Sequence, residues 1–276
     1  MGARRKVWDP ARPPRLLQLF TIAYLIWWLV PLVLLIRASF SDSFDTVRPT
    51  GFTFDWFRSV FRDDVLLAAL KHSVRLAVAT VAIALPLGTA LALGLRHTPG
   101  RLSRGITSLT LFALATPQAF LSVGIFLVIV YLTPGVRFGG TTQLMAHATI
   151  AIPFVTVILL MRLSAIGREH EESAMDLGAS PLSAFRRAVL PQLAPAVVAA
   201  AAVAFVLSFD NIIMSDHLCL TNECRTVPLF LMRGRGEIAG DPGVAALGVV
   251  GMLLTTALAA VAFPVLVRLT GRRAPA

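Results

Sequence analysis

Six long, uninterrupted apolar runs constrain this chain more than any other feature of its sequence. Each run holds between 21 and 27 residues, and together they make up half of the 276 residues. The runs are 16–36, 74–95, 106–132, 142–162, 193–214 and 243–267. A helix needs about 20 apolar residues to cross the hydrocarbon of a bilayer, and in lipid its backbone must satisfy its own hydrogen bonds. The sequence therefore predicts an all-α integral membrane protein with six transmembrane helices.

Few polar residues or prolines interrupt these runs. Only 14% of the residues are charged, against about 25% in soluble domains. We expect Pro86, Pro117 and Pro153 to be kinks of the kind that transmembrane helices tolerate. His147 lies inside the fourth run; we favour a ring packed against neighbouring helices with both nitrogens bonded over a titrating residue of a transport pathway. The first run is expected to be retained, because its 21 residues exceed the roughly 7–15 of a signal peptide.

Basic residues predict which side of the membrane each connection occupies. Fifteen Lys or Arg residues and five acids lie in the segments 1–15, 96–105, 162–192 and 268–276, whereas the other connections hold nine basic and nine acidic residues. Cytoplasmic segments are enriched in Lys and Arg, so both termini, 1–15 and 268–276, are expected to be cytoplasmic. The net charge of +10 follows from this topology and gives no reason to invoke nucleic acid.

The predicted external segment 37–73 combines acids and turn formers with a group of aromatic residues. Phe52, Phe54, Trp56 and Phe57 fall within six positions. Two interpretations fit equally well. The segment is either a hairpin or short amphipathic helix at the level of the lipid headgroups, where aromatic side chains gather, or an ordinary connecting loop.

A long charged connection, 163–192, stands out on the predicted cytoplasmic side, and connections of this length inside a compact bundle are usually functional. Residues 169–177 are good helix formers with acids in the first turn, which suits the helix dipole. Gly178 fits the left-handed position after a helix. Ser180 and Pro181 fit the N-cap and first position of a second helix. The sequence therefore predicts two short helices around a glycine corner.

The spacing in this connection resembles a loop motif of ABC importer permeases: Glu-Ala-Ala, three residues, Gly, nine residues, Ile-x-Leu-Pro. The matching residues here are Glu172, Ser173, Ala174, Gly178, Leu190 and Pro191, with departures at Ser173 and at Ala188. In that family the loop docks on a cytoplasmic ATPase and transmits its movement, so the resemblance assigns ATPase coupling to these residues. It also implies the type I importer permease (MetI-like) fold. Substituting Gly178 with Asp is expected to abolish transport.

The resemblance extends from about Lys71 to Val267 and implies a permease core over 74–267. Further matching residues are His72-Ser73, Gly88-Thr89-Ala90, Thr116-Pro117, His147 and Pro153-Phe154. The segment LSFDNII, 207–213, resembles the second membrane subunit of spermidine/putrescine-type importers. The family implies a second permease chain, expected to be different, two ATPase subunits, an external substrate-binding protein and a bacterial inner membrane. ATP and Mg would be bound by the ATPase, and this chain would bind no cofactor.

Other classes of membrane protein have less support. The chain contains no Gly-x-x-x-x-Gly-Lys-Ser/Thr, so it is not itself the ATPase. It also lacks His-Glu-x-x-His and Gly-x-Ser-x-Gly, which argues against a membrane-embedded enzyme. A secondary transporter or a channel is the remaining alternative of another class, and the loop motif argues against it.

Asp210 is an acid near the outer end of the fifth apolar run, where such residues normally face a cavity or a partner. Either its carboxylate lines a passage for a cationic amine, together with Ser208 and Asn211, or it reaches out to water. The polyamine permeases usually carry a second acid in place of Asn211, and Glu and Asn in place of Gly243 and Ala245. A smaller or zwitterionic substrate such as 2-aminoethylphosphonate is therefore a second candidate.

The two cysteines, Cys219 and Cys224, fall in the predicted external loop after the fifth run. Disulfides persist in oxidising compartments, and Thr221-Asn222 permits the turn that a small ring requires. We expect a disulfide that fixes this loop at the mouth of the passage, where it would help to receive the binding protein; free thiols are the alternative. A metal site is not expected, because His217 is the sole further ligand nearby.

Overall fold

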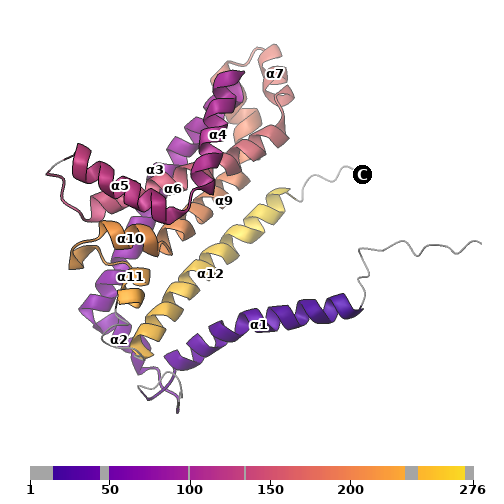
Figure 1. The fold of residues 1–276 in the computed structure, drawn as a ribbon. Coiled ribbons are helices and arrows are strands. Elements are labelled where there is room, and N and C mark those ends of the chain that lie inside the picture. Colours follow the sequence, from indigo (N-terminus) through magenta and orange to yellow (C-terminus); the bar gives the residue numbers. More distant parts are fainter. Residues whose placement is uncertain (1–14, 44–49, 99, 134, 234–241, 271–276) are drawn as a thin grey trace, which may run out of the picture.

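The structure, a computed structural model, describes residues 15–43, 50–98, 100–133, 135–233 and 242–270, which form helices and short connections with no β-strand among them (Figure 1). In chain order the elements are α1 (Arg15–Ser39), α2 (Asp55–Arg62), α3 (Asp64–His97), α4 (Arg101–Ala115), α5 (Gln118–Leu132), α6 (Gly140–Ile166), α7 (Glu169–Asp176), α8 (Pro181–Ala184), the π-helical turn η1 (Phe185–Val189), α9 (Leu190–Phe209), α10 (Ile212–Leu218), the 3-10 turn η2 (Asn222–Cys224), α11 (Val227–Arg233) and α12 (Pro242–Thr270). Five helical spans are long and apolar enough to cross a membrane, and there are six if the bent pair α4 and α5 is counted as one span. The predicted all-α class is confirmed, while the terminal segments 1–15 and 268–276 lie largely outside the described residues.

The third apolar run, 106–132, is not the single helix that the sequence predicts. Its two halves, α4 and α5, are bent by 106° with respect to each other at the break between them. Thr116 is extended, with ψ of 126°, which is the conformation that a following proline favours. Pro117 in turn has no N–H with which to continue the helix. Pro86 and Pro153, by contrast, lie inside α3 and α6 without ending either helix.

The predicted boundaries of the fifth run, 193–214, are also wrong at both ends. The helix begins at Pro181 and continues through α8, η1 and α9 to Phe209. The second short helix expected at Pro181 is therefore the start of this span. The chain then turns, and α10 begins at Ile212, because Asn211 caps α10: the Met214 N–H donates to Asn211 Oδ1 at 3.0 Å.

Much of the segment 37–73 is helical. It contains α2 and the first turns of α3, whose start is set by Asp63: the carboxylate accepts the Val65 and Leu66 N–H groups at 2.8 and 3.2 Å. The aromatic residues cluster, and Phe40 stacks on Phe52 with ring centroids 5.1 Å apart. Of the two interpretations, the structure favours a short helix over an ordinary connecting loop.

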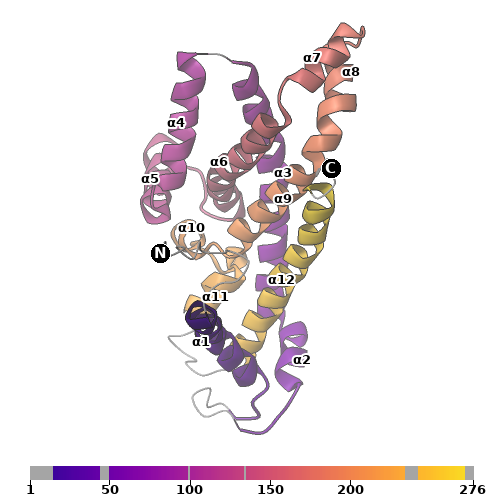
Figure 2. The same ribbon diagram turned by 90° about the vertical axis from the view of Figure 1, so that its right-hand side faces the viewer.

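The core lies where α3, α6 and α9 pack side by side (Figures 1 and 2). Small residues allow the close approach of these helices, as is common in membranes. A Cβ added at Gly88 of α3 would lie 2.6 Å from Val155 Cγ1 of α6. Ala84, Ala200 and Ala204 are fully buried in the same cluster. The three helices thus form a closely packed core that positions the sites described below.

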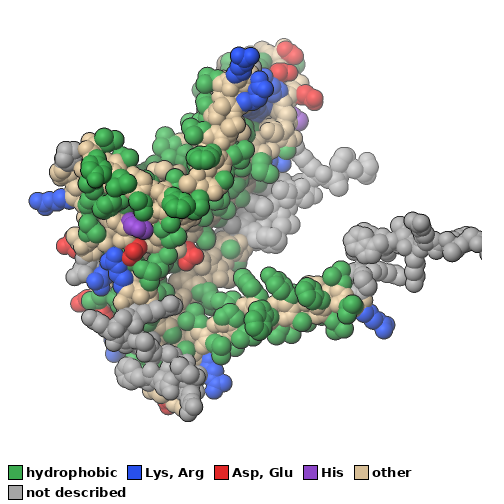
Figure 3. All heavy atoms as spheres, in the orientation of Figure 1, with side chains coloured by type: hydrophobic (Ala, Val, Ile, Leu, Met, Phe, Trp, Pro, Cys, Tyr) green, Lys and Arg blue, Asp and Glu red, His purple; other side chains and the backbone are tan. Residues whose placement is uncertain are grey.

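α1 leans away from this core (Figure 1) and is buried only at its last residues, Ala38 and Ser39, which lie next to the start of α12. The rest of its length is covered by exposed hydrophobic side chains (Figure 3). A helix that is apolar on all sides is suited to the interior of a membrane. α7 and α8 lie at one end of the molecule and α2 at the opposite end (Figure 2), so the 163–192 connection projects at the end opposite to the aromatic cluster.

Candidate functional site

The first candidate site is the break between α9 and α10 at Asp210-Asn211. Asn211 caps α10, as described above, and its Nδ2 donates to Gln118 Oε1 of α5 at 3.2 Å. The break in α9 and the break before α5 are thus joined by one hydrogen bond. Interrupted helices are tolerated at membrane depth where the backbone is buried in protein or lines a cavity, and in transporters such interruptions form substrate sites.

A buried polar network holds the break in place. The His147 ring of α6 lies between two hydroxyls, with Nδ1 2.9 Å from Ser208 Oγ and Nε2 3.3 Å from Ser215 Oγ. Ser208 Oγ is also 3.0 Å from Thr80 Oγ1 of α3. All four side chains are at most 2% exposed. His147 is therefore packed with both nitrogens bonded, as the favoured interpretation of the sequence had it, and the network joins α3, α6, α9 and α10.

The three residues predicted for a substrate pathway do not share one environment. Ser208 and Asn211 are buried and bonded within the protein, whereas Asp210 is exposed. Asp210 borders a hollow of about 370 Å³ that α1, α9, α11 and α12 line, largely with apolar groups such as Leu32 and Leu231. A carboxylate at the rim of an apolar hollow can attract a cationic group, and the pathway role of Asp210 stays a prediction. Ser208 and Asn211 shape the break.

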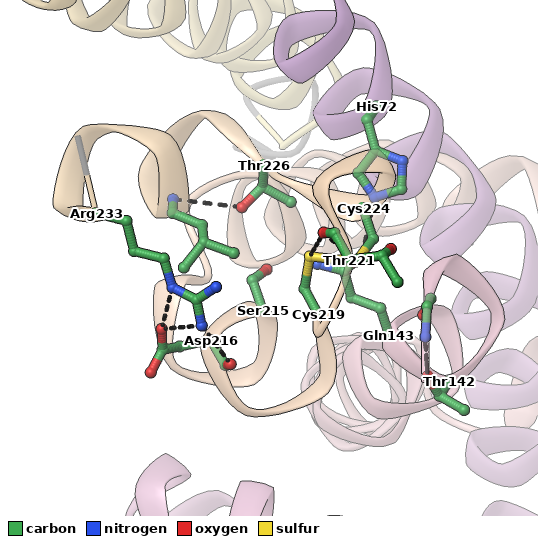
Figure 4. Close-up of a disulfide and its surroundings, with 12 residues drawn as sticks. His72, Thr142, Gln143, Ser215, Asp216, Cys219, Thr221, Cys224, Thr226 and Arg233 are labelled. Atoms are coloured by element: carbon green, nitrogen blue, oxygen red, sulfur yellow. Dashed lines mark hydrogen bonds and ion pairs between the residues drawn. A yellow bond between two sulfur atoms is a disulfide. The ribbon is translucent and has the colours of Figure 1, made fainter. Parts of the chain in front are cut away.

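The segment after α10 is a compact hairpin held by a disulfide and an ion pair (Figure 4). Cys219 and Cys224 form a disulfide with Cα atoms 5.5 Å apart, and both are buried. Asp216 and Arg233 form an ion pair at 2.9 Å across the hairpin. The Val227 N–H donates to Ser73 Oγ of α3 at 2.7 Å. The hairpin is therefore fixed internally and also attached to α3.

The second candidate site is the 163–192 connection, and its local structure follows the sequence closely. α7 ends at Asp176, and Gly178 adopts φ of +88°, a left-handed conformation that glycine takes without strain. Ser180 caps the next helix by accepting the Ser183 N–H at 3.4 Å, and Pro181 occupies its first turn. The predicted glycine corner is present, although the helix after it is continuous with α9.

The glycine corner presents exposed side chains of two kinds. Leu177 is 90% exposed and Leu182 68%. α7 contributes acids and η1 contributes Arg186 and Arg187, and acidic and basic side chains gather at this end of the molecule (Figure 3). Glu172 and Ser173 are exposed, whereas Ala174 is half-buried. Exposed apolar groups rimmed by charge are typical of a protein contact surface, which suits a docking role.

Two residues that hold this connection were missed by the sequence analysis. Arg96, in the last turn of α3, has a nitrogen 3.4 Å from Glu171 Oε2 of α7. Glu171 directly precedes the motif residue Glu172, and Arg96 opens the connection 96–105; both residues entered the sequence analysis only through the charge counts of their segments. Their separation of 75 positions left no sequence signal for the pairing.

Comparisons with known proteins agree with this architecture. A family described as binding-protein-dependent transport system inner membrane component matches residues 84–274. The spermidine/putrescine transport system permease protein PotC of Haemophilus influenzae is 27% identical over 230 residues, covering 83% of this chain and 88% of PotC. The putrescine transport system permease protein PotI of Escherichia coli K12 is 31% identical over 215 residues, covering 76% of this chain and 75% of PotI.

Solved structures share the fold at lower identity. A bacterial ABC transporter involved in the import of the acidic polysaccharide alginate has a chain with a TM-score of 0.72 and 16% identity, covering 92% of this chain and 95% of its own. An amino acid ABC transporter gives a TM-score of 0.60 and 15% identity, covering 79% and 100%. The predicted permease fold is confirmed. This chain belongs to the binding-protein-dependent transport system inner membrane components, the permease subunits of ABC importers.

Proposed function

We propose that this permease provides part of the route for a small cationic amine, with putrescine and spermidine as the first candidates. The observation that carries the proposal is the similarity to PotC and PotI over most of both chains. Asp210 supports it, because an exposed carboxylate beside an apolar hollow suits an ammonium group on a short hydrocarbon chain. The break at Asp210-Asn211 gives the route a place where backbone polar groups meet the passage.

Coupling to ATP hydrolysis is proposed to occur at the 163–192 connection. Glu172, Ala174 and Gly178 stand at the corner, and Leu190-Pro191 close the motif where α9 begins. The exposed Leu177 and Leu182 supply apolar surface for a groove on an ATPase subunit. Pro181–Phe209 is one continuous helical span. A displacement of the glycine corner by the ATPase would therefore be transmitted along this span to the break at Asp210.

The assembly would contain a second, different permease, two ATPase subunits that bind ATP and Mg, and an external substrate-binding protein. A related structure supports the last partner: a bacterial alginate ABC transporter in complex with its alginate-bound periplasmic protein, with a TM-score of 0.71 to this chain. Taken together, the segments 1–15, 96–105, 162–192 and 268–276 hold fifteen basic residues and five acids, and this excess supports a cytoplasmic location for the connection and for both termini. The Cys219–Cys224 hairpin would then face the binding protein.

A zwitterionic substrate such as 2-aminoethylphosphonate is the second candidate. Gly243 and Ala245 are buried at the start of α12, where polyamine permeases carry Glu and Asn, so this chain offers fewer polar groups to a polycation. A phosphonate would also be repelled less by one carboxylate than by two.

Uptake by cells with and without this gene tests the proposal. The probes are labelled putrescine, spermidine, 2-aminoethylphosphonate and a neutral sugar, each measured with and without depletion of cellular ATP. Loss of polyamine uptake alone in the deletion strain supports the amine assignment. Loss of the phosphonate alone favours the second candidate, and uptake that survives ATP depletion contradicts ATP coupling.

A further inference from the structure

We propose that Arg96 and Glu171 are positioning residues that clamp the 163–192 connection to the end of α3, so that α3 and α9 move together when the connection is pushed. The inference rests on the proposed coupling function and concerns residues outside the loop motif. The clamp consists of Arg96 of α3, Glu171 of α7, and the two residues between α6 and α7, Gly167 and Arg168.

Three helices meet at the Arg96 guanidinium. One of its nitrogens, Nη2, donates to the Gly167 carbonyl oxygen at 2.5 Å and lies 3.4 Å from Glu171 Oε2. Gly167 ends α6 with φ of +72°, and Glu171 lies in the first turn of α7. In return, Arg168 donates to the backbone oxygen of Arg96. The connection is therefore bonded to α3 in both directions.

The charges of the clamp are buried, which makes the pair sensitive to change. The side chains of Arg96 and Glu171 are 6% and 12% exposed. Arg96 Nε and Nη1 are also buried, with no hydrogen-bond partner among the described residues. His97 Nε2 lies 3.7 Å from Glu171 Oε1 but is half-exposed. Glu171 is thus the acid that compensates the buried guanidinium, and removing either partner leaves a buried charge unpaired.

Two helices lead from the clamp to the break at Asp210. α9 reaches it by continuity from Pro181 to Phe209. α3 reaches it through Thr80, about 24 Å from Arg96 along a helix, because Thr80 Oγ1 lies 3.0 Å from Ser208 Oγ. Without the clamp, the connection could move α9 against a stationary α3 and break this hydrogen bond. With the clamp, α3 and α9 are displaced together, so the hydrogen bond between Thr80 and Ser208 is kept while the break moves.

The test uses the assembled importer, with its partner permease, ATPase and binding protein, in proteoliposomes. Uptake of labelled putrescine and ATP hydrolysis are measured in the same vesicles for Arg96→Glu, Glu171→Arg and the double reversal. We expect each single reversal to lower uptake per ATP about tenfold and the double reversal to restore it to within about threefold of wild type. Asp64→Asn, at an exposed acid in the first turn of α3 and far from the connection, is the control and should change nothing.

A second variant covers the case in which a reversed charge prevents folding. The double variant Arg96→Cys, Glu171→Cys is treated with a short bis-maleimide, which joins the two new cysteines. The native cysteines do not react, because they are already bonded to each other. The joined protein should transport with wild-type coupling, and the unjoined double variant should be uncoupled.

The outcomes separate the clamp from the proposed function. An inactive wild-type assembly overturns the coupling function and the clamp together. An active wild type whose single reversals keep wild-type uptake per ATP overturns the clamp alone. So does a double reversal no better than the single reversals, if the joined cysteine protein is also uncoupled.

Discussion

The glycine corner of the 163–192 connection and the break at Asp210-Asn211 both interrupt the helices of this protein. They differ in how far apart in the sequence the residues that shape them lie. The corner of the connection is shaped by Gly178 and by a cap between Ser180 and Ser183, three positions apart. The break is shaped by His147, whose partners lie 61 and 68 positions away, and by a bond that spans 128 positions. The shape of the glycine corner is therefore set by local contacts, although the Arg96–Glu171 pair also ties α7 to α3. The shape of the break is set mainly by contacts between helices.

This difference predicts how each region fails. A substitution at the glycine corner changes a contact surface at the end of the molecule, so transport should be lost while the helical core stays intact. A substitution in the polar network unpairs buried groups between helices, so stability should fall first and transport should follow. The predictions below test this division.

The largest effect is expected for Gly178→Val. No heavy atom lies within 4 Å of a Cβ built at Gly178, so the cost comes from the positive φ, about 1–2 kcal/mol for an ordinary residue and more for a branched one. Because the corner is surrounded by open space, we expect it to relieve this strain by changing its own conformation. Uptake should then fall more than about tenfold, while the thermal unfolding midpoint of the purified protein changes little. Gly178→Asn is the control, because Asn adopts this conformation more readily.

Two results would contradict that prediction. If Gly178→Asn were as inactive as Gly178→Val, collision of any side chain with a partner would explain the loss better than backbone conformation. A Val variant with normal uptake would show that the corner is not needed.

His147→Leu should have the next largest effect, and on stability. It removes two hydrogen bonds, those of the ring nitrogens with Ser208 Oγ at 2.9 Å and Ser215 Oγ at 3.3 Å. Each hydroxyl keeps one other partner, so we count about 0.5–1.5 kcal/mol for each lost hydrogen bond. We expect the unfolding midpoint in detergent to fall by several degrees, measured by differential scanning fluorimetry. His170→Leu, at an exposed position of α7, is the control. Equal midpoints for the two variants would mean that the network does not hold the break.

Replacing both cysteines with serine should have a smaller and more confined effect. A ring closed over a sequence separation of 5 restricts the unfolded chain by about 2 kcal/mol. We expect faster amide exchange over residues 212–233, with the rest of the molecule unchanged. Before reduction, a membrane-impermeant thiol reagent should not label the wild-type protein; prompt labelling would argue against the bond.

The same division explains what the sequence could predict. Gly178, Ser180 and Pro181 act through their own backbone conformation and immediate neighbours, so their roles were visible in the sequence. The break at Thr116-Pro117 was predicted only as a kink, because Pro86 and Pro153 sit in similar apolar runs and leave their helices intact. The three prolines differ in what surrounds them in the fold, and single-sequence patterns do not contain that information.

The candidate pathway shows the same limit. The sequence pointed to Asp210 because an acid within an apolar run is costly in a membrane and usually has a function. Its neighbours Ser208 and Asn211 were grouped with it by proximity in sequence, yet the structure buries both of them and exposes Asp210. Helical periodicity predicts which side chains are buried only while the helix continues. α9 ends at Phe209 and Asn211 caps α10, so periodicity does not predict the burial of residues 210 and 211.

The smallest expected effect is that of Asp210→Asn on uptake itself. An exposed carboxylate contributes at most about 1 kcal/mol to an ion pair, which is roughly a fivefold change in affinity. We therefore expect the putrescine concentration for half-maximal uptake to rise about fivefold, with unchanged unfolding and an unchanged maximal rate. Glu223→Gln, an exposed acid in η2, is the matched control for charge alone. A drop in stability for Asp210→Asn would place Asp210 with the buried network, whereas equal effects of both variants would indicate general attraction of cations to the surface and remove Asp210 from the pathway.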